Sequence, residues 1–314
     1  MTGRVVTLGE TMGLFRATSL GSIAQVSDFH LGIGGAESNV AVALARLGAS
    51  VTWLGRIGAD GLGDRILREL RGEGIDVQAI RDPAPTGLMV KEQRTSTATR
   101  VAYYRRDSAG SHLATSDLAA ARIGSAAVLH VTGITPALSE TAADAVRSAI
   151  ADAVDAGVAV SFDVNHRGSL WGERNAASVY RELAASATIL FAGEDEARLI
   201  APDADGAEQL ATAIAALGPR EVVIKRGAAG CLALIDGTVH VRAAVPIHPV
   251  DTVGAGDAFV AGYLAERLLG LPADARLATA VAMGAFACLN PGDWEGYPRR
   301  DELGLLHAEE PVTR

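Results

Sequence analysis

Aromatic residues and cysteines are scarce in this chain of 314 residues. Phe, Trp and Tyr together make up 4% of the sequence against 49% hydrophobic residues, so Ala, Val and Leu must fill most of the core. Only two cysteines occur, Cys231 and Cys288, and neither has the spacing of a metal ligand. We therefore expect buried thiols rather than a disulfide, which fits a reducing, cytoplasmic setting.

Positive charge and long apolar runs are also in short supply. The formal net charge is −9 and no basic block offsets it, which argues against nucleic acid as the main partner. An anionic small molecule remains possible, because it needs only a local basic pocket. The longest apolar stretch, Leu277 to Leu289, is too short to span a bilayer and predicts a buried helix, so no membrane partner is expected. Residues 4–9 have a strand pattern rather than that of a signal peptide.

Short β-rich runs alternate with helical patterns along most of the chain. This alternation favours an α/β fold with a mostly parallel, doubly wound sheet flanked by helices, in a single domain spanning residues 1–314. The expected strands are Val5–Gly9, Val51–Gly55, Val128–Thr132, Val158–Asp163, Ile189–Ala192 and Glu221–Lys225. The expected helices are Glu37–Leu47, Leu62–Arg71, Thr141–Asp155, Ser178–Ala185 and Ala207–Leu217. From about His307 the sequence is polar and is expected to be frayed.

Two stretches break this alternation. Residues 86–106 alternate with a two-residue period on either side of a polar tip at 95–97, which predicts a hairpin, and Asp28 to Ile33 adds a further strand. We expect a small β-sheet built from about residues 10–35 and 86–106. It would form a lid that keeps water from the reaction, or an edge used only for dimerisation. Exposed Leu88 and Val101 on such a lid would favour a homo-oligomer.

The stretch Asp251-Thr-Val-Gly-Ala-Gly-Asp257 carries the clearest chemical signal. After it, an apolar-periodic run predicts a helix whose first turn begins near Gly256. Unpaired N–H groups and the helix dipole favour an anion there, and Gly254 and Gly256 let it approach the backbone.

A carboxylate beside such an anion pocket suits phosphoryl transfer. The amides of Gly254, Ala255 and Gly256 would hold the charge on the moving group, while Asp257, kept ionised by the helix start, takes a proton from the attacking hydroxyl. The alternative is that Thr252 or Asp251 caps the helix and Asp257 only complements its dipole.

Four separated motifs resemble the ribokinase, or PfkB, family of carbohydrate kinases. They are Gly34-Gly-Ala-Glu-Ser-Asn39-Val-Ala41, Ile57-Gly-Ala-Asp-Gly-Leu-Gly63, Lys225-Arg-Gly-Ala-Ala-Gly230 and the stretch 251–257. The resemblance covers most of the chain and implies a ribokinase-like fold, ATP as donor, Mg²⁺ and transfer to a sugar hydroxyl. No Gly-x-x-x-x-Gly-Lys-Ser/Thr occurs, which disfavours a P-loop enzyme.

The resemblance also assigns residues to the two substrates and the metals. The nucleotide would meet the set Asn165, Lys225, Gly227, Gly230, Gly254 and Gly256. Glu196 would support Mg²⁺ through water, and Asp251 lies in a stretch similar to a monovalent-cation loop, which allows K⁺. From the residues alone, Gly227 and Gly230 could instead shape a hairpin between Val223 and Leu232, and Gly34-Gly35 could form only a tight strand-to-helix turn.

Two further segments, Tyr103–Ala109 and Asp163–Trp171, resemble the 2-keto-3-deoxygluconate kinases of that family. The implied substrate-binding residues are Gly34, Gly35, Asn39, Tyr103, Arg105, Ile134, Arg167, Asp257 and Asp293. A carboxylate suits arginine forks, and a neutral hexose would leave Arg105 and Arg167 facing no anion, so a sugar acid is the expected partner of ATP. Surface arginines are the alternative.

Two positions depart from the family pattern. Gly193 stands where an Asn is expected ahead of Glu196, and Met89 where some relatives carry Tyr. Other acceptors on the same fold are fructose, ribose and a deoxy-keto-inositol acid, 5-dehydro-2-deoxygluconate. A sugar- or nucleotide-binding sensor without catalysis is the distant alternative. His130, in an apolar strand, is expected to be a core residue, and His166 lacks metal-ligand spacing.

Overall fold

The structure, a computed structural model, describes residues 3–95 and 98–307. The tip residues 96–97 and the polar segment 308–314 lie outside this range. Within it, nine strands form one sheet in the order β13-β12-β11-β10-β9-β8-β1-β4-β5. Their bounds are β1 Val5–Leu8, β4 Val51–Gly58, β5 Asp76–Asp82, β8 Val128–Thr132, β9 Ala159–Asp163, β10 Ile189–Gly193, β11 Glu221–Lys225, β12 Cys231–Ile235 and β13 Thr238–Arg242.

The strands from β5 to β11 pair in parallel, and β12 and β13 add an antiparallel edge. The expected mostly parallel sheet is therefore confirmed. Of the six predicted strands, two match the structure completely, three differ by one residue at one end, and Val51–Gly55 is three residues shorter than β4. This agreement arises because buried β-branched runs mark central strands clearly. The five predicted helices differ from the structure by one or two residues at their ends. The edge strands β5 and β13 were not predicted, since their residues are mostly exposed or half-buried and show little apolar pattern.

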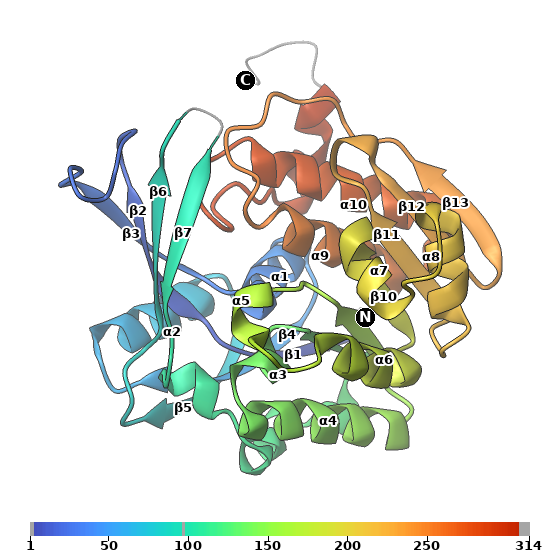
Figure 1. Ribbon diagram of the computed structural model, residues 1–314, viewed down its shortest axis with the longest axis horizontal. Helices are drawn as coiled ribbons and strands as arrows, with labels where there is room; N and C mark the ends of the chain where they lie inside the picture. Colours follow the sequence, from blue (N-terminus) through green and yellow to red (C-terminus); the bar gives the residue numbers. More distant parts are fainter. Residues whose placement is uncertain (1–2, 96–97, 308–314) are drawn as a thin grey trace.

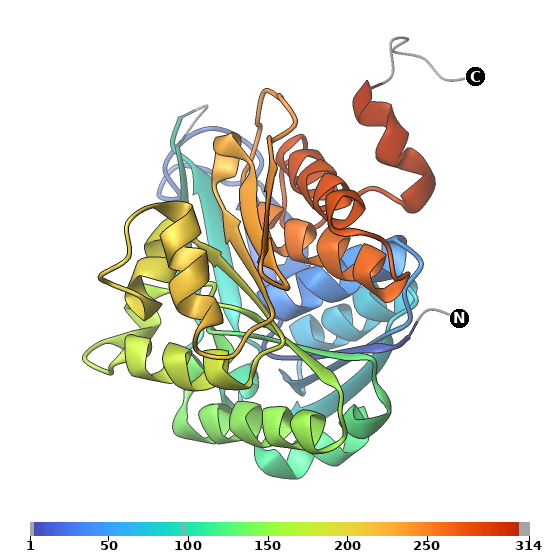
Figure 2. The ribbon, with the colours of Figure 1, turned by 90° about the vertical axis from the view of Figure 1, so that its right-hand side faces the viewer.

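Helices cover both faces of this sheet (Figure 2). One face packs against α1 Ala36–Arg46, α2 Gly61–Gly72, α9 Ala255–Leu268 and α10 Ala273–Cys288. The other packs against α4 Glu140–Asp155, α6 Ala176–Ser186, α7 Glu194–Ile200 and α8 Gly206–Ala215. Two short helices, α3 Thr135–Leu138 and α5 Gly168–Trp171, follow the carboxyl ends of β8 and β9. The two apolar layers that result make the sheet doubly wound.

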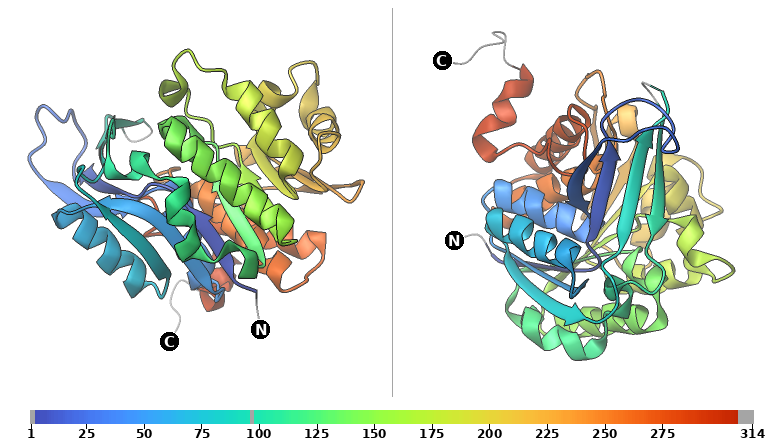
Figure 3. Two further views of the ribbon diagram at one scale, coloured as in Figure 1. Left: turned by 90° about the horizontal axis from the view of Figure 1, so that it is seen from below. Right: turned by 90° about the vertical axis from the view of Figure 1, so that its left-hand side faces the viewer.

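A second sheet of four strands has the order β3-β2-β6-β7. Its bounds are β2 Met12–Ala17, β3 Phe29–Gly34, β6 Leu88–Gln93 and β7 Thr99–Tyr104. Strands β6 and β7 form the predicted hairpin, and the sheet projects beside the main body (Figure 1; Figure 3, right). Leu88 and Val101 are half-buried rather than exposed, whereas Tyr103 and Tyr104 are 44% and 64% exposed.

The structure also bears on the two cysteines and on membrane-spanning helices. Cys231 and Cys288 are both free, as expected. Within the described part of the chain, no helix has the length and apolar character needed to cross a membrane. Three 3-10 segments between residues 109 and 125 connect β7 to β8 in place of a regular crossover helix (Figure 3, left).

Candidate functional site

A single pocket between the small sheet and the carboxyl ends of the large sheet collects most of the expected substrate residues. Its lining includes Gly35, Asn39, Tyr103, Arg105, Ile134, Arg167, Gly254, Asp257 and Asp293. Gly34 lies directly beside it, because a Cβ at this position would come within 2.3 Å of Asp293 Oδ2 and 2.4 Å of Met89 Cε. The glycine is therefore needed for a close approach, beyond forming a turn.

Asp257 lies at the base of this pocket, in the first turn of α9, and is buried. Asn39 on α1 donates Nδ2 to its Oδ2 at 2.8 Å, and Asn165 after β9 donates Nδ2 to its Oδ1 at 3.2 Å. Asn165 adopts a left-handed backbone conformation with φ of 38°. The two amides orient the carboxylate and leave its remaining lone pairs for a proton.

The pKa of Asp257 is raised to about 7, mainly by burial. The charge of Asp163 also raises it, whereas the Asn39 hydrogen bond and the charges of Arg167 and Lys225 lower it. The expectation that the helix start keeps this group fully ionised is thus corrected. In the free protein near neutral pH, the carboxylate and the carboxylic acid coexist. A pKa near the working pH is the value that suits a general base.

The start of α9 is open to an anion. Its N-cap is Gly254, with φ of +78°, and among the described residues no side chain caps it. Neither Thr252 nor Asp251 is the cap, so that alternative is wrong. Gly254, Ala255 and Gly256 are all partly exposed at the start of the helix, as the anion hypothesis requires. The Ala255 N–H makes a long hydrogen bond of 3.4 Å to the Thr252 carbonyl.

Arg105 has a buried partner that the sequence did not predict. Its Nε donates to Glu10 Oε2 at 2.7 Å, and its Nη2 contacts the same oxygen. The other carboxylate oxygen of Glu10 accepts a hydrogen bond from Ser108. The argument that a neutral sugar would leave two arginines without an anion is therefore wrong for Arg105.

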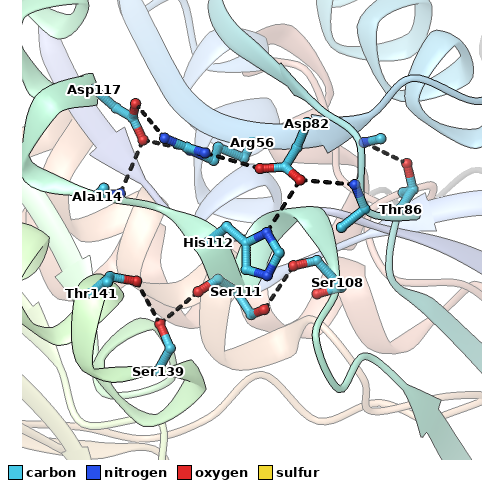
Figure 4. Close-up of polar contacts among 12 residues, drawn as sticks. Arg56, Asp82, Thr86, Ser108, Ser111, His112, Ala114, Asp117, Ser139 and Thr141 are labelled. Atoms are coloured by element: carbon cyan, nitrogen blue, oxygen red, sulfur yellow. Dashed lines mark hydrogen bonds and ion pairs between the residues drawn. The ribbon is translucent and has the colours of Figure 1, made fainter.

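A polar network holds the turn that carries Ser108 (Figure 4). Ser111 Oγ donates to the Ser108 carbonyl at 2.7 Å, and Ser139 Oγ donates to the Ser111 carbonyl at 2.6 Å. Nearby, Arg56 joins the carboxylates of Asp82 and Asp117 at 2.9 and 2.7 Å. These contacts fix the turn after β7, and through Ser108 they fix Glu10 and the Arg105 guanidinium.

Arg167 lines the pocket, and Glu196 holds the loop that carries it. Arg167 is exposed and is the N-cap of α5. Glu196 accepts from the backbone N–H of Gly193 at 2.6 Å and of His166 at 2.8 Å, so it caps α7 and holds the loop after β9. Burial alone would raise the pKa of Glu196, but the Lys225 charge and the two backbone donors outweigh it and lower the pKa.

Glu196 is therefore an ionised carboxylate, which fits the support of a hydrated Mg²⁺. Within the described residues no group of three or more His, Cys, Asp or Glu side chains is arranged to hold a metal ion. Gly193 leaves space for a side chain, since an added Cβ would be 3.5 Å from Glu196 Oε2.

Lys225 ends β11 and forms an ion pair with Asp163 at the end of β9, with Nζ–O distances of 2.8 and 2.9 Å. It lies beside the start of α9, because a Cβ on Gly256 would be 3.6 Å from its Nζ. Gly230 has φ of +85°, and a Cβ there would lie 2.0 Å from the Arg242 carbonyl oxygen. The hairpin alternative for this segment is thus correct for Gly230, and Gly227 is exposed in the same turn.

Asp251 contacts an ammonium group from the small sheet. Lys91 Nζ lies 2.5 Å from Asp251 Oδ2 and 3.6 Å from Asp293 Oδ1. Burial raises the pKa of Asp293 to about 6, although the Lys91 charge pulls it down. The Lys91 ammonium thus lies beside the carboxylate for which the resemblance allows K⁺.

Sequence reasoning missed several residues of the pocket, above all Glu10 and Glu37. Glu10 directly follows the buried strand β1, which places an acid at the ligand-binding edge of the sheet, and this signal could have found it. Glu37 is buried, and Thr132 and Thr135 donate to its Oε1 at 2.7 and 2.6 Å. Of the histidines, His130 is the expected core residue, hydrogen-bonded to Ser161 at 3.0 Å, and burial lowers its pKa to about 3.

Comparison with known proteins agrees with this arrangement. The family model for pfkB family carbohydrate kinases matches residues 2–300. The chain belongs to the PfkB family. It is 38% identical over 98% of its length, and 96% of the relative's, to a 2-dehydro-3-deoxygluconokinase of Bacillus subtilis (strain 168). It is 34% identical, over 93% of each chain, to a 2-dehydro-3-deoxygalactonokinase of Haloferax volcanii. The resemblance stated from the motifs is therefore confirmed at the level of the family.

Solved structures of PfkB proteins share the fold. A Vibrio cholerae O395 fructokinase with fructose, ADP and potassium bound superposes with a TM-score of 0.85 at 26% identity, covering 97% of this chain and 98% of that one. A putative ribokinase II from E. coli, solved with ATP and Mg²⁺, gives 0.88 at 24% identity over 97% and 98%. This PfkB chain is accordingly a ribokinase-like sugar kinase by family and fold.

Two glycines of the helix start should respond differently to alanine. Gly254→Ala would place a Cβ 1.9 Å from the Asp293 carbonyl oxygen at a positive φ, so we expect the free energy of unfolding to fall by at least about 2 kcal/mol. Gly256→Ala meets only ordinary contacts and should change it by less than about 1 kcal/mol, while hindering phosphate approach and ADP release. Denaturant unfolding and an ADP-release assay measure both effects. Equal destabilisation by the two variants would contradict this account of the turn.

Proposed function

We propose that this PfkB kinase transfers the γ-phosphoryl group of ATP to 2-keto-3-deoxygluconate (2-dehydro-3-deoxygluconate), giving the 6-phosphate. The observation that carries the proposal is the buried Asp257 carboxylate at an open helix start, in one pocket with Arg105 and Arg167. The name of the 38% identical relative supports the same acceptor.

In this proposal Asp257 accepts the proton of the attacking hydroxyl. The amides of residues 254–256 stabilise the charge on the group in transfer, because they are fixed donors at the positive end of α9. ATP, bound with Mg²⁺, supplies the phosphoryl group. Glu196 supports the cation, and Lys225 lies beside the helix start where phosphate oxygens would gather.

Arg105 and Arg167 would bind the carboxylate of the sugar acid. Glu10 takes the Nε and Nη2 edge of Arg105, so the Nη1 donors are the ones that reach the substrate. The Arg105 guanidinium also lies 5.7 Å from the centre of the Tyr103 ring, which stacks against it. A guanidinium held on two sides is pre-organised, so little entropy is lost when it meets an anion.

The small sheet would act as the lid over this pocket. It contributes Met12, Met89 and Tyr103 to the lining, which also contains Asp257. Closing such a sheet onto a bound sugar would exclude water, which competes with the sugar for the phosphoryl group.

Other acceptors remain as the second candidate function. The 34% identical relative acts, by its name, on 2-dehydro-3-deoxygalactonate, which differs from the gluconate in the configuration of one carbon. Fructose, ribose and 5-dehydro-2-deoxygluconate complete the panel of acceptors to compare. A sensor without catalysis, suggested by Gly193, would release no ADP with any of them.

Asp257→Asn tests the general base. We expect turnover to fall by about 10²–10⁴, the usual size of general-base catalysis, with a much smaller effect on binding of either substrate. Circular dichroism and thermal unfolding serve as controls for the fold. Turnover close to that of the unaltered protein would remove Asp257 from this role.

The pH dependence follows from the pKa of Asp257, about 7 in the free protein. Because the base must be deprotonated, kcat/KM should rise about tenfold per pH unit below 7 and level off above it. Asn39→Ala provides the control: removing this hydrogen bond raises the Asp257 pKa, so the midpoint should move to higher pH. Titration of ATP itself cannot produce that movement. An unmoved midpoint would contradict the assignment.

Variants of Arg105 test whether the acceptor must carry a negative charge. Replacing Arg105 alone would leave the Glu10 carboxylate buried without its partner. The double variant Glu10→Gln/Arg105→Met keeps the site neutral, and Glu10→Gln alone is its matched control. Relative to that control, we expect kcat/KM for the sugar acid to fall about 10- to 100-fold, the worth of a charged hydrogen bond, and for fructose by only a few fold. Equal losses on both acceptors would argue for a neutral substrate.

A further inference from the structure

Lysine is rare in this chain and occurs at only two positions. Lys91 and Lys225 are the only lysines among 28 Lys and Arg residues. Each forms an ion pair with a buried aspartate, Lys91 with Asp251 and Lys225 with Asp163. Lys225 belongs to the nucleotide side already described. Lys91 has no role in the proposed chemistry, yet its side chain is only 3% exposed.

The Lys91 ammonium joins three segments that are distant in sequence. It comes from β6 of the small sheet, contacts Asp251 Oδ2 at 2.5 Å, and donates to the Gly292 carbonyl at 3.3 Å. Asp251 in turn accepts from the N–H of Val253 at 3.2 Å and of Gly292 at 3.3 Å. The ammonium is therefore enclosed by carboxylate and carbonyl oxygens.

These contacts hold the residues that precede α9. Gly254 packs so closely on the 292–297 segment that its Cα faces the Asp293 carbonyl, and Tyr297 donates its hydroxyl to the Gly254 carbonyl at 2.7 Å. Displacing Asp251 or Gly292 would shift the amides that start the helix. The position of the helix start thus depends on a cation between Asp251 and Gly292.

An ammonium group and a potassium ion are similar in size and charge, and both are satisfied by oxygen ligands. Lysine provides such a compact point charge, whereas the planar fork of arginine does not fit an enclosed site of this kind. We propose that Lys91 is a positioning residue whose ammonium replaces the monovalent cation at the 251–254 loop, so that this kinase sets its anion-binding helix start without potassium. The inference deepens the proposed kinase function and rests on it for its catalytic part.

The arrangement also links the small sheet to the helix start. Lys91 and Met89 are two residues apart on β6, so their side chains lie on the same face of the small sheet. Met89 lines the substrate pocket. Movement of the small sheet over a bound sugar would therefore displace the Lys91 ammonium and its partner Asp251.

Lys91→Met tests the proposal, with Arg100→Met as the matched control, because Arg100 is a cation on the neighbouring strand β7 whose side chain is 79% exposed. ADP release and the midpoint of thermal unfolding are measured in KCl, NH₄Cl, LiCl and choline chloride at equal ionic strength. The unaltered protein and Arg100→Met should respond equally to all four salts. In choline chloride, Lys91→Met should lose about 10- to 100-fold in ADP release, as expected for catalytic groups displaced by about 1 Å.

KCl and NH₄Cl, but not LiCl, should restore most of the activity of Lys91→Met and raise its unfolding midpoint. A role in stability alone would not produce a rescue of activity that is selective for ion size. Stimulation of the unaltered protein several-fold by KCl would overturn the proposal, and so would full activity of Lys91→Met in choline chloride or the lack of any response to K⁺ and NH₄⁺.

A second variant keeps the test decisive if Lys91→Met does not fold. Lys91→Met/Asp251→Asn removes both buried charges, so it should fold but show no cation rescue, because the carboxylate ligand is gone. Rescue of the double variant by KCl would contradict the proposal. If no sugar acid releases ADP, the proposed function fails, whereas the unfolding midpoints still report on Lys91.

Discussion

The burial of one carboxylate, Asp257, is the constraint on which the site depends. The group comes from the first turn of α9, and its two amide partners come from α1 and from the loop after β9. Neither amide can be moved without leaving a buried carboxylate short of a donor, which is costly away from water. The doubly wound sheet meets this demand because the carboxyl ends of its parallel strands bring these loops to one edge.

Three of the surrounding cations are paired before any ligand arrives. Arg105 is held by Glu10, Lys225 by Asp163 and Lys91 by Asp251, and in each pair one or both members are buried. Such pairs add little to stability, since the desolvation of both ions offsets their attraction. Their effect is to fix cations at defined places around Asp257, so that anionic substrates meet rigid donors instead of mobile side chains.

Most of the fold, and the centre of the site, could be predicted from the sequence. Buried strands such as Val128–Thr132 have uninterrupted apolar runs, and the glycines around Ala255 mark a helix start that an anion can approach. The edge strand β5 could not be recognised, because exposed positions carry Asp76 and Arg81 in place of an alternating apolar pattern.

The partners of the charged residues could not be predicted either. Glu10 and Arg105 are 95 residues apart, and Lys91 and Gly292 are 201 apart, so only the tertiary fold brings them together. The sequence pattern of β6 would be the same whether the Lys91 ammonium were exposed to solvent or paired with Asp251. The sequence therefore predicted most of the residues that face the pocket but not Glu10 or Glu37, and the structure revealed which charges are already neutralised.

A crystal structure with the sugar acid and a non-hydrolysable ATP analogue would test the central claim most directly. The account predicts that the terminal hydroxyl of the sugar lies within about 2.6–3.2 Å of an Asp257 carboxylate oxygen, with the γ-phosphate against the amides of residues 254–256. A bound hydroxyl far from Asp257, or a γ-phosphate away from the start of α9, would contradict it.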